Sequence, residues 1–229
     1  SPLFASTEGE AMNSTLVKAI QAMTYEDPPH EVADGFKEQG NEALKEKQYK
    51  NALISYTNGI DACLEAKEHI FLLKEKGGPD GVDLLQDPDP NLRGEDLENA
   101  VTSRKNAFIQ LWEQMKKDED LKSKIDQAEM QCFNNRAQVH LVLQNYRKCI
   151  QDCKEVLSYD PKNIKAFWRT VKSAYDLRRY KLCKRYCTKA IKSINKKDPV
   201  ESKMLPLFVK HEKLCDEQLM KQVIKKREQ

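Results

Sequence analysis

The strongest constraint on the fold of this chain is a sequence repeat with a period of 34 residues. When one unit starts at Met130 and the next at Ile164, similar residue types fall at matching positions. These pairs are Phe133 with Phe167, Tyr146 with Tyr180, Cys149 with Cys183, and Cys153 with Cys187. Each unit offers two amphipathic segments joined at a turn that contains a tyrosine. Such a unit cannot bury its apolar face alone, so neighbouring units have to stack on one another.

An earlier copy of the unit begins at Ala33. Its large and small side chains are Phe36, Gly40, Ala43, Tyr49, Ala52, Tyr56 and Gly59. Met130 lies 97 residues after Ala33, so one period of 34 and an insertion of 63 residues separate the first two copies. The sequence therefore predicts an all-α protein built from three helix pairs, with an interruption after the first pair.

The pattern resembles the tetratricopeptide repeat family. In that family an aromatic residue stands near the fourth position, small residues near the eighth and twentieth, and often a proline near the end. Pro161 matches, and so do the small residues Gly40, Ala52, Ala137, Cys149 and Cys183. Small side chains let the two helices of a pair approach closely. The resemblance implies a tetratricopeptide-repeat superhelix of three helix pairs, in which the bulkier Val171 predicts a wider contact in the third pair.

The segments outside the three repeats complete one predicted domain over the whole chain, 1–229. Its expected parts are an N-terminal segment 1–29, repeat 1 at 30–66, an insertion at 67–129, repeat 2 at 130–163, repeat 3 at 164–197 and a capping helix at 199–229. Apolar residues at helical spacing predict a helix in the N-terminal segment: Met12, Leu16, Ala19, Ile20 and Met23. A partial apolar stripe follows Pro199, namely Leu205, Phe208, Leu214, Leu219 and Val223, as expected of a helix that covers the end of a repeat array.

The insertion has two parts of different composition. Its first part, GGPDGVDLLQDPDPNLRGED, is rich in glycine, proline and aspartate, which favours a mobile loop. The following segment places Val101, Phe108, Leu111, Trp112 and Met115 on one face of a helix. We expect this helix to join the stack, with Trp112 as a packed cover rather than a hot spot for a partner.

Charge and composition exclude several classes of function. The net charge is +3, from 39 basic and 36 acidic residues, so no global field draws the chain to nucleic acid or to an anionic membrane. The sequence shows no run of about 18 apolar residues and no signal peptide in SPLFASTEGE. We expect a soluble cytoplasmic protein, with the nucleus as a second location. Because it starts at Ser1 and ends on KKREQ, we also expect a fragment of a longer protein.

The seven cysteines point to reduced, packed thiols rather than to a disulfide framework. Cys149 with Cys153, and Cys183 with Cys187, are four residues apart, but these positions are buried in the repeat pattern, where cysteine packs as a small hydrophobe. The four histidines form no spaced cluster with them. We therefore predict no metal and no cofactor, with zinc as the weaker alternative.

Five polar residues fall on the first helix of the three repeats, which lines the inside of such a stack. Lys37 and Asn41 are four residues apart in repeat 1, Asn135 lies in repeat 2, and Lys165 and Arg169 are four apart in repeat 3. Two cations at i and i+4 repel by about 0.2–0.5 kcal/mol in an isolated helix. A helix that carries this stripe is suited to an anionic ligand, and the sequence predicts a binding groove.

The strings FKEQGN, CFNNRA and NIKAFWR resemble the two-carboxylate clamp of repeat domains that bind the tails of heat-shock proteins 90 and 70. In that family the ligand ends in Glu-Glu-Val-Asp. The resemblance implies that Lys37, Asn41 and Asn135 contact the terminal carboxylate, and that Lys165 and Arg169 contact the last Asp side chain. We expect further groove contacts from Leu44, Gln138 and Lys172.

The wider stretch AIQAMTYEDPPHEVADGFKEQGNEALKEKQYKNALISYTNGI resembles the tetratricopeptide repeat protein 4 family, co-chaperones of heat-shock protein 90. The resemblance implies an adaptor that binds the tail of heat-shock protein 90, with that of heat-shock protein 70 as a second ligand, and that recruits a client or second protein. We expect no enzyme, since the sequence offers no phosphate-cradling glycine loop and no nucleophile with its base.

Two other classes of function stay open at this point. One is a scaffold whose groove binds another acidic peptide, such as the Asp-rich loop of the insertion. The other is a nucleic-acid-binding helical repeat, suggested by the basic segments KLCKRYCTKAIKS and KQVIKKREQ. The balanced charge elsewhere and the lack of strings that mix aromatic and basic residues disfavour nucleic acid and membrane partners.

Overall fold

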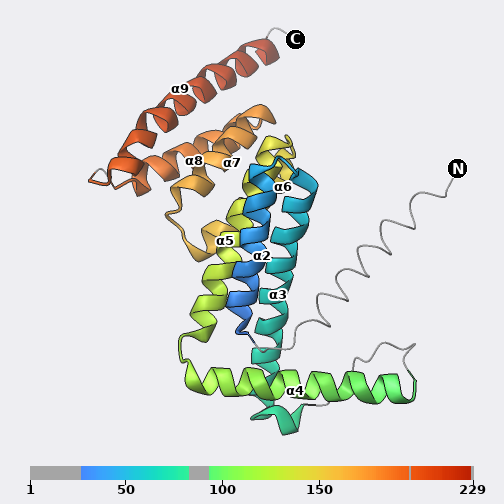
Figure 1. The fold of residues 1–229 in the computed structure, drawn as a ribbon. Coiled ribbons are helices and arrows are strands. Elements are labelled where there is room, and N and C mark those ends of the chain that lie inside the picture. Colours follow the sequence, from blue (N-terminus) through green and yellow to red (C-terminus); the bar gives the residue numbers. More distant parts are fainter. Residues whose placement is uncertain (1–26, 83–92, 196, 228–229) are drawn as a thin grey trace, which may run out of the picture. The chain divides into compact units, whose positions relative to one another are not determined.

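The computed structural model describes residues 27–82, 93–195 and 197–227, and this part of the chain is helical without any strand. The helices are α2 (Pro29–Lys45), α3 (Tyr49–Lys76), α4 (Glu95–Lys117), α5 (Leu121–Val142), α6 (Tyr146–Tyr159), α7 (Ile164–Asp176), α8 (Tyr180–Ser193) and α9 (Pro199–Arg227), with a short 3-10 turn η1 (Pro79–Gly81) after α3 (Figure 1). The all-α prediction is confirmed. None of these helices is long and apolar enough to cross a membrane. The helix predicted around Met12–Met23 lies outside the described residues.

The 34-residue period is visible in the backbone of the turns between paired helices. Lys47, Gln144 and Arg178 have φ angles of 60°, 59° and 57°, and each stands two residues before the tyrosine that begins the second helix. A residue in this left-handed conformation closes the C-terminus of a helix. The same backbone bond recurs in all three turns, from Gln48 to Ala43, from Asn145 to His140 and from Arg179 to Ala174, each at 2.8 Å. The repeat read from the sequence is therefore a repeat of structure.

The described helices belong to two compact units. The first contains the chain up to Glu38 together with Thr57–Glu129, and the second contains Gln39–Tyr56 and the chain from Met130 onward. The division passes through α2, α3 and α5, and of its three points only the one between Glu129 and Met130 coincides with an expected boundary, the start of repeat 2. Each unit is described by itself below, and the organisation as one domain over 1–229 stays a prediction.

The first unit is built around the insertion. Helix α3 continues to Lys76 and ends at Gly77 and Gly78, which both have positive φ angles, and α4 is the helix predicted after the loop. Its apolar core consists of Ala33, Cys63, Ala66, Ile70, Leu73, Phe108, Leu111, Leu121, Ile125 and Ala128. Trp112 is half-buried and packs against this core, as expected of a cover.

A buried ion pair also holds the first unit together. Glu129 is 1% exposed, and its carboxylate accepts a hydrogen bond from Lys67, whose Nζ also lies 2.5 Å from Asp126. A buried carboxylate without such a partner would cost several kcal/mol. Lys67 on α3 therefore fixes the start of α5 against α3.

The second unit shows how side-chain volume is exchanged within each helix pair. At Gly40 a β-carbon would lie 2.5 Å from the ring of Tyr56, so only glycine fits beside this tyrosine. The corresponding partners are Ala137 with Cys153, and Val171 with Cys187, all fully buried. Where alanine or valine replaces glycine on the first helix, cysteine thus replaces the large tyrosine on the second. Packing at this density leaves no room for large side chains at both positions.

Helices α6, α7, α8 and α9 pack successively, and α9 also touches α7 (Figure 1). Phe208 of α9 is fully buried and meets the ring of Trp168 edge-on, with 5.8 Å between the centroids. The predicted helix after Pro199 is confirmed, but the apolar stripe expected along it does not pack over its full length. Val223 is 46% exposed.

All seven cysteines lie in the described part of the chain, and all are buried free thiols. Cys149 and Cys153 pack with Ala137, Val156 and Ala166, while Cys183 and Cys187 belong to the core shared by α7, α8 and α9. The predicted packing of these cysteines as small buried side chains is confirmed. Among the described residues no three side chains of metal-binding type are grouped closely enough to hold an ion.

Candidate functional site

Four of the five predicted site residues belong to the second unit, and they come from three different helices. Asn41 lies on α2, Asn135 on α5, and Lys165 and Arg169 on α7. These are the first helices of the three predicted pairs. Polar side chains thus stand at related positions of successive repeats, which is how a repeat fold builds one extended binding face.

Asn41 and Asn135 are joined directly, although they are 94 residues apart in the sequence. The amide nitrogen Nδ2 of Asn135 donates to Oδ1 of Asn41 at 3.1 Å, and the hydroxyl of Tyr56 donates to the same oxygen at 2.8 Å. Two donors on one amide oxygen fix the orientation of the Asn41 side chain.

Arg169 is held by two neutral side chains. Its Nε donates to Oε1 of Gln138 at 2.9 Å and its Nη1 donates to Oδ1 of Asn134 at 2.5 Å. Within residues 27–82, 93–195 and 197–227 no carboxylate forms an ion pair with Arg169. Burial lowers the pKa of this guanidinium below its ordinary value, but arginine stays charged near neutral pH. The structure therefore presents a partly desolvated cation whose charge is not neutralised by the chain described.

The two lysines of α7 extend the positive charge of Arg169 along the helix. Lys165 lies in the first turn of α7, after Asn163, whose side chain caps the helix by accepting from the Ala166 N–H at 3.0 Å. Lys172 follows Arg169 by three residues. Both lysines are exposed, and neither forms an ion pair in the part of the chain that the structure describes. Residues 165, 169 and 172 share one side of α7.

Lys37 belongs to the first unit and stands one helical turn before Asn41 on α2. Its Nζ lies 2.6 Å from Asp34 and 3.8 Å from Glu38, and only 15% of its side chain is exposed. The sequence analysis did not consider Asp34 as a partner, although acid and base three residues apart on a helix commonly pair. The structure thus places Lys37 in an ion pair of its own helix.

The additional groove residues have different roles. Gln138 binds Arg169, whereas Leu44 packs with Tyr56, Ala52 and Val139 in a small core cluster. Sequence reasoning missed Asn134, which holds Arg169, and it treated Tyr56 only as a packing residue. The signal for Asn134 was its place beside Asn135 in the string CFNNRA.

Comparison with known proteins finds two co-chaperones among the proteins to which this chain is similar. The chain is 26% identical over 202 residues to the Hsp70/Hsp90 co-chaperone CNS1 of Saccharomyces cerevisiae, covering 88% of this chain and 36% of that protein. It is 29% identical over 182 residues to the Hsp70/Hsp90 co-chaperone cns1 of Schizosaccharomyces pombe, covering 78% and 34%. The chain thus spans about a third of the length of these two relatives. No family model matches the chain.

A shorter match and a solved structure agree with these relatives. Over 71 residues the chain is 37% identical to the DNA polymerase interacting tetratricopeptide repeat-containing protein of 47 kDa from Drosophila melanogaster, covering 30% of this chain and 18% of that protein. The structure of the Hsp90 co-chaperone Cns1 from Saccharomyces cerevisiae superposes with a TM-score of 0.50 at 24% identity, covering 90% of this chain and 47% of that one. The fold is therefore the tetratricopeptide-repeat type found in that co-chaperone.

Proposed function

We propose that this chain, a relative of tetratricopeptide-repeat co-chaperones of Hsp70 and Hsp90, is a cytoplasmic co-chaperone module that binds the acidic C-terminal tail of heat-shock protein 90. The ligand ends in Glu-Glu-Val-Asp, and its two terminal carboxylates are held by Lys37, Asn41, Asn135, Lys165 and Arg169. The tail of heat-shock protein 70 offers the same chemistry and is a second ligand. Assignment to the tetratricopeptide repeat protein 4 family is part of this proposal.

The environment of Arg169 is the observation that carries the proposal. A guanidinium held by the amide oxygens of Asn134 and Gln138 keeps its full charge while it has lost part of its hydration. A carboxylate at this place would restore the lost stabilisation, because charge-assisted hydrogen bonds contribute about 1.5–3 kcal/mol each. Such a site favours an anion over a neutral ligand.

The amides of Asn41 and Asn135 supply the second half of the proposed clamp. Asn41 is oriented by Tyr56 and Asn135, so the entropy of fixing its side chain is already lost before the ligand binds. An oriented amide donates to a carboxylate without adding charge. This arrangement suits the terminal main-chain carboxylate of a peptide, while Lys165 and Arg169 suit the side chain of its last aspartate.

Lys37 is included in the proposed clamp because it stands one turn before Asn41 on α2. Its pair with Asp34 is half-exposed on the Asp34 side, and pairs at such sites contribute only about 0–1 kcal/mol. Little free energy is therefore lost when Lys37 turns from Asp34 to a carboxylate of the ligand. Partial exposure and the ordering of a flexible tail limit the total, so we expect micromolar rather than nanomolar affinity.

The test is a titration with a fluorescent peptide that ends in Glu-Glu-Val-Asp, compared with the same peptide amidated at its C-terminus. We expect amidation, Arg169→Ala or Lys165→Glu each to weaken binding about tenfold. Lys154→Glu on α6 is the matched control, because Lys154 is exposed and outside the site. Equal affinity for the free and amidated peptides would rule out the clamp and favour a scaffold that binds internal acidic segments.

A further inference from the structure

An exposed side of α8 carries positive charge that the proposed clamp does not use. Lys181, Arg185, Lys189 and Lys192 are exposed and recur every three or four residues, so they lie along one side of the helix. None of them forms an ion pair with another described residue of the chain. The result is an uncompensated basic stripe, within the segment KLCKRYCTKAIKS.

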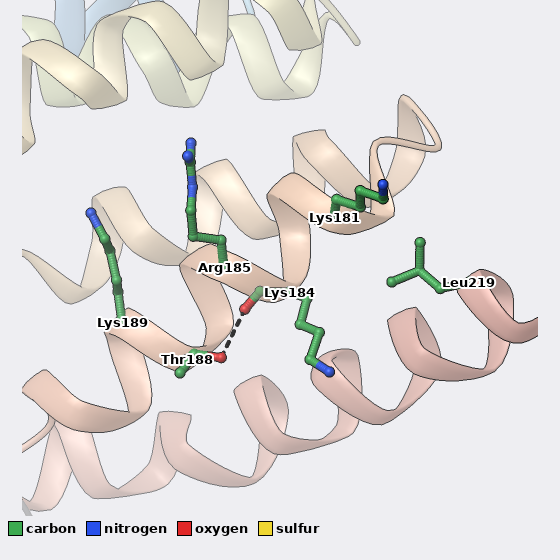
Figure 2. Close-up of a pocket in the computed structure, with 6 residues that line it drawn as sticks. All are labelled: Lys181, Lys184, Arg185, Thr188, Lys189 and Leu219. Atoms are coloured by element: carbon green, nitrogen blue, oxygen red, sulfur yellow. Dashed lines mark hydrogen bonds between the residues drawn. The ribbon is translucent and has the colours of Figure 1, made fainter.

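A recess of about 440 Å³ opens beside this stripe, between α8 and α9 (Figure 2). It is lined by Lys181, Lys184, Arg185, Thr188, Lys189 and Leu219. Lys184 pairs with Asp216 at 2.6 Å, and the Thr188 hydroxyl lies 2.5 Å from Glu212, so these two residues hold α9 to α8. Three of the four cations at the recess therefore stay available to a ligand.

The directions of these cations indicate the shape of the ligand. Arg185 and Lys189 both extend from α8 away from α9, whereas Lys184 points toward α9 (Figure 2). The charges therefore do not converge on one point, as they would around a single phosphate. Arg185 and Lys189 both lie over the ring of Tyr186, at 5.6 and 5.8 Å from its centroid, and this tyrosine is only 8% exposed. The recess thus offers no open ring on which a base could stack.

Beyond the recess, the last turns of α9 expose apolar side chains. Met220, Val223 and Ile224 are 64%, 46% and 53% exposed, and their spacing places them on one side of the helix. Val223 stands one turn after Leu219, which lines the recess, so the two residues share a side of α9. Exposed apolar side chains grouped in this way are typical of a docking surface. The basic stripe and this apolar group form what we name the α8–α9 surface.

We propose that the α8–α9 surface docks an acidic amphipathic helix of a partner protein. Carboxylates one turn apart on such a helix match the spacing of Lys181, Arg185 and Lys189, because both helices rise by about 5.4 Å per turn. Apolar side chains on its neighbouring side enter the recess at Leu219 and cover Met220. A recess receives the side-chain ridge of a helix, whereas a flat bilayer or a regular duplex does not reach into it.

The test measures binding of a fluorescent helical peptide with glutamate at every fourth position and leucine beside it, at low salt. We expect Lys181→Glu combined with Arg185→Glu to weaken binding at least tenfold, and Ile224→Asp combined with Met220→Asp to weaken it at least threefold. Lys154→Glu is the control and should leave the affinity unchanged. Replacing the peptide glutamates by glutamine should also abolish binding, and this arm needs no protein variant.

Two further ligands decide between classes of partner. A single-stranded oligonucleotide and vesicles with anionic lipid should each bind at least tenfold more weakly than the peptide. The proposal is overturned if either binds as tightly as the peptide, or if the affinity for the peptide survives the charge reversal. It is also overturned if the apolar substitutions have no effect. The same variants should bind a Glu-Glu-Val-Asp tail normally, so this test is independent of the clamp.

Discussion

Two arginines of the second unit, on neighbouring helices, have opposite electrostatic surroundings. Arg136 on α5 forms a two-pronged bond with Asp152, with Nε at 3.1 Å from Oδ2 and Nη2 at 2.9 Å from Oδ1. Arg169 on α7 meets only the amide oxygens of Asn134 and Gln138. The first charge is neutralised within the fold and serves stability. The second is left without a counter-charge in the described chain, and we assign it to a ligand.

The largest effect should come from breaking the neutralised pair. Asp152→Ala removes a carboxylate of which 5% is exposed and leaves Arg136 without its counter-charge. Removing one partner of a buried ion pair typically costs about 3–5 kcal/mol, and we expect the lower end because Arg136 is partly exposed. Urea unfolding monitored by circular dichroism measures this loss. An unchanged midpoint would show that Asp152 does not stabilise the fold.

The next effect concerns His69, a buried imidazole whose role we consider structural. Burial, assisted by the charge of Arg104, lowers the pKa of His69 to about 4, and its ring packs 4.4 Å from that of Phe108. Between pH 6.5 and 4 the unfolded chain takes up a proton that the folded chain does not. The free energy of unfolding should therefore fall by about 2 kcal/mol from His69 between pH 7 and pH 5.

The control for this pH effect is His69→Leu, which cannot titrate. Its free energy of unfolding should depend less steeply on pH than that of the parent over the same range, while all other groups titrate in both. Parallel pH profiles would contradict the account of His69. Peptide binding at pH 7 should be the same in both proteins, because His69 is not a residue of the proposed clamp.

The substitution Arg169→Met tests whether the arginine without a counter-charge serves binding rather than stability. The substitution should weaken binding of the free-carboxylate tail about tenfold, or about 1.4 kcal/mol, because a charged contact is lost. Stability should change little or increase, since a desolvated cation without a carboxylate does not favour folding. Isothermal titration and urea unfolding of the same variant give both numbers. A large loss of stability with unchanged binding would show that Arg169, like Arg136, serves the stability of the fold and not the ligand.

A smaller effect is expected at Gln138, which orients Arg169. Gln138→Leu removes the acceptor of the Nε bond at 2.9 Å but keeps the charge. The guanidinium then has to be ordered by the ligand, and we expect about a threefold loss of tail affinity. Gln127→Leu is the control, because Gln127 is an exposed glutamine on the same helix. If Gln138→Leu and Gln127→Leu weakened tail binding equally, Gln138 would not be the residue that orients Arg169.

The smallest expected effect comes from Asp34→Asn. Releasing Lys37 from its 2.6 Å contact should strengthen tail binding about twofold, since weak surface pairs contribute about 0–1 kcal/mol. The gain should disappear when Lys37 is also replaced by methionine. A gain that persists in the double variant would mean that Lys37 does not contact the ligand.

The sequence predicted the helix pairs well because their signals are local. Periodic tyrosines marked the helix starts at Tyr49, Tyr146 and Tyr180, and small residues marked close helix contacts. The extension of α3 to Lys76 was not predicted, since repeat 1 was expected to end at residue 66. The repeat register gave one boundary of the two compact units, at Met130, but not those within α2 and α3, because the division depends on contacts between distant segments.

The candidate site was predicted only in part, because hydrogen-bond partners depend on three-dimensional neighbours. Repeat positions indicated Asn41, Asn135 and Arg169, and the structure joins the first two. They did not indicate that Tyr56 orients Asn41 or that Asn134 holds Arg169. These bonds span 15 and 35 residues, and no residue pattern encodes them.

The proposed function depends on a direct contact between Arg169 and a carboxylate of the ligand. It is tested most directly by a double-mutant cycle that combines Arg169→Met with a peptide whose last aspartate is replaced by asparagine. We predict a coupling free energy of about 1 kcal/mol or more, because each change removes the same charged contact. If the two changes are additive within about 0.3–0.5 kcal/mol, Arg169 does not meet this carboxylate and the account is contradicted.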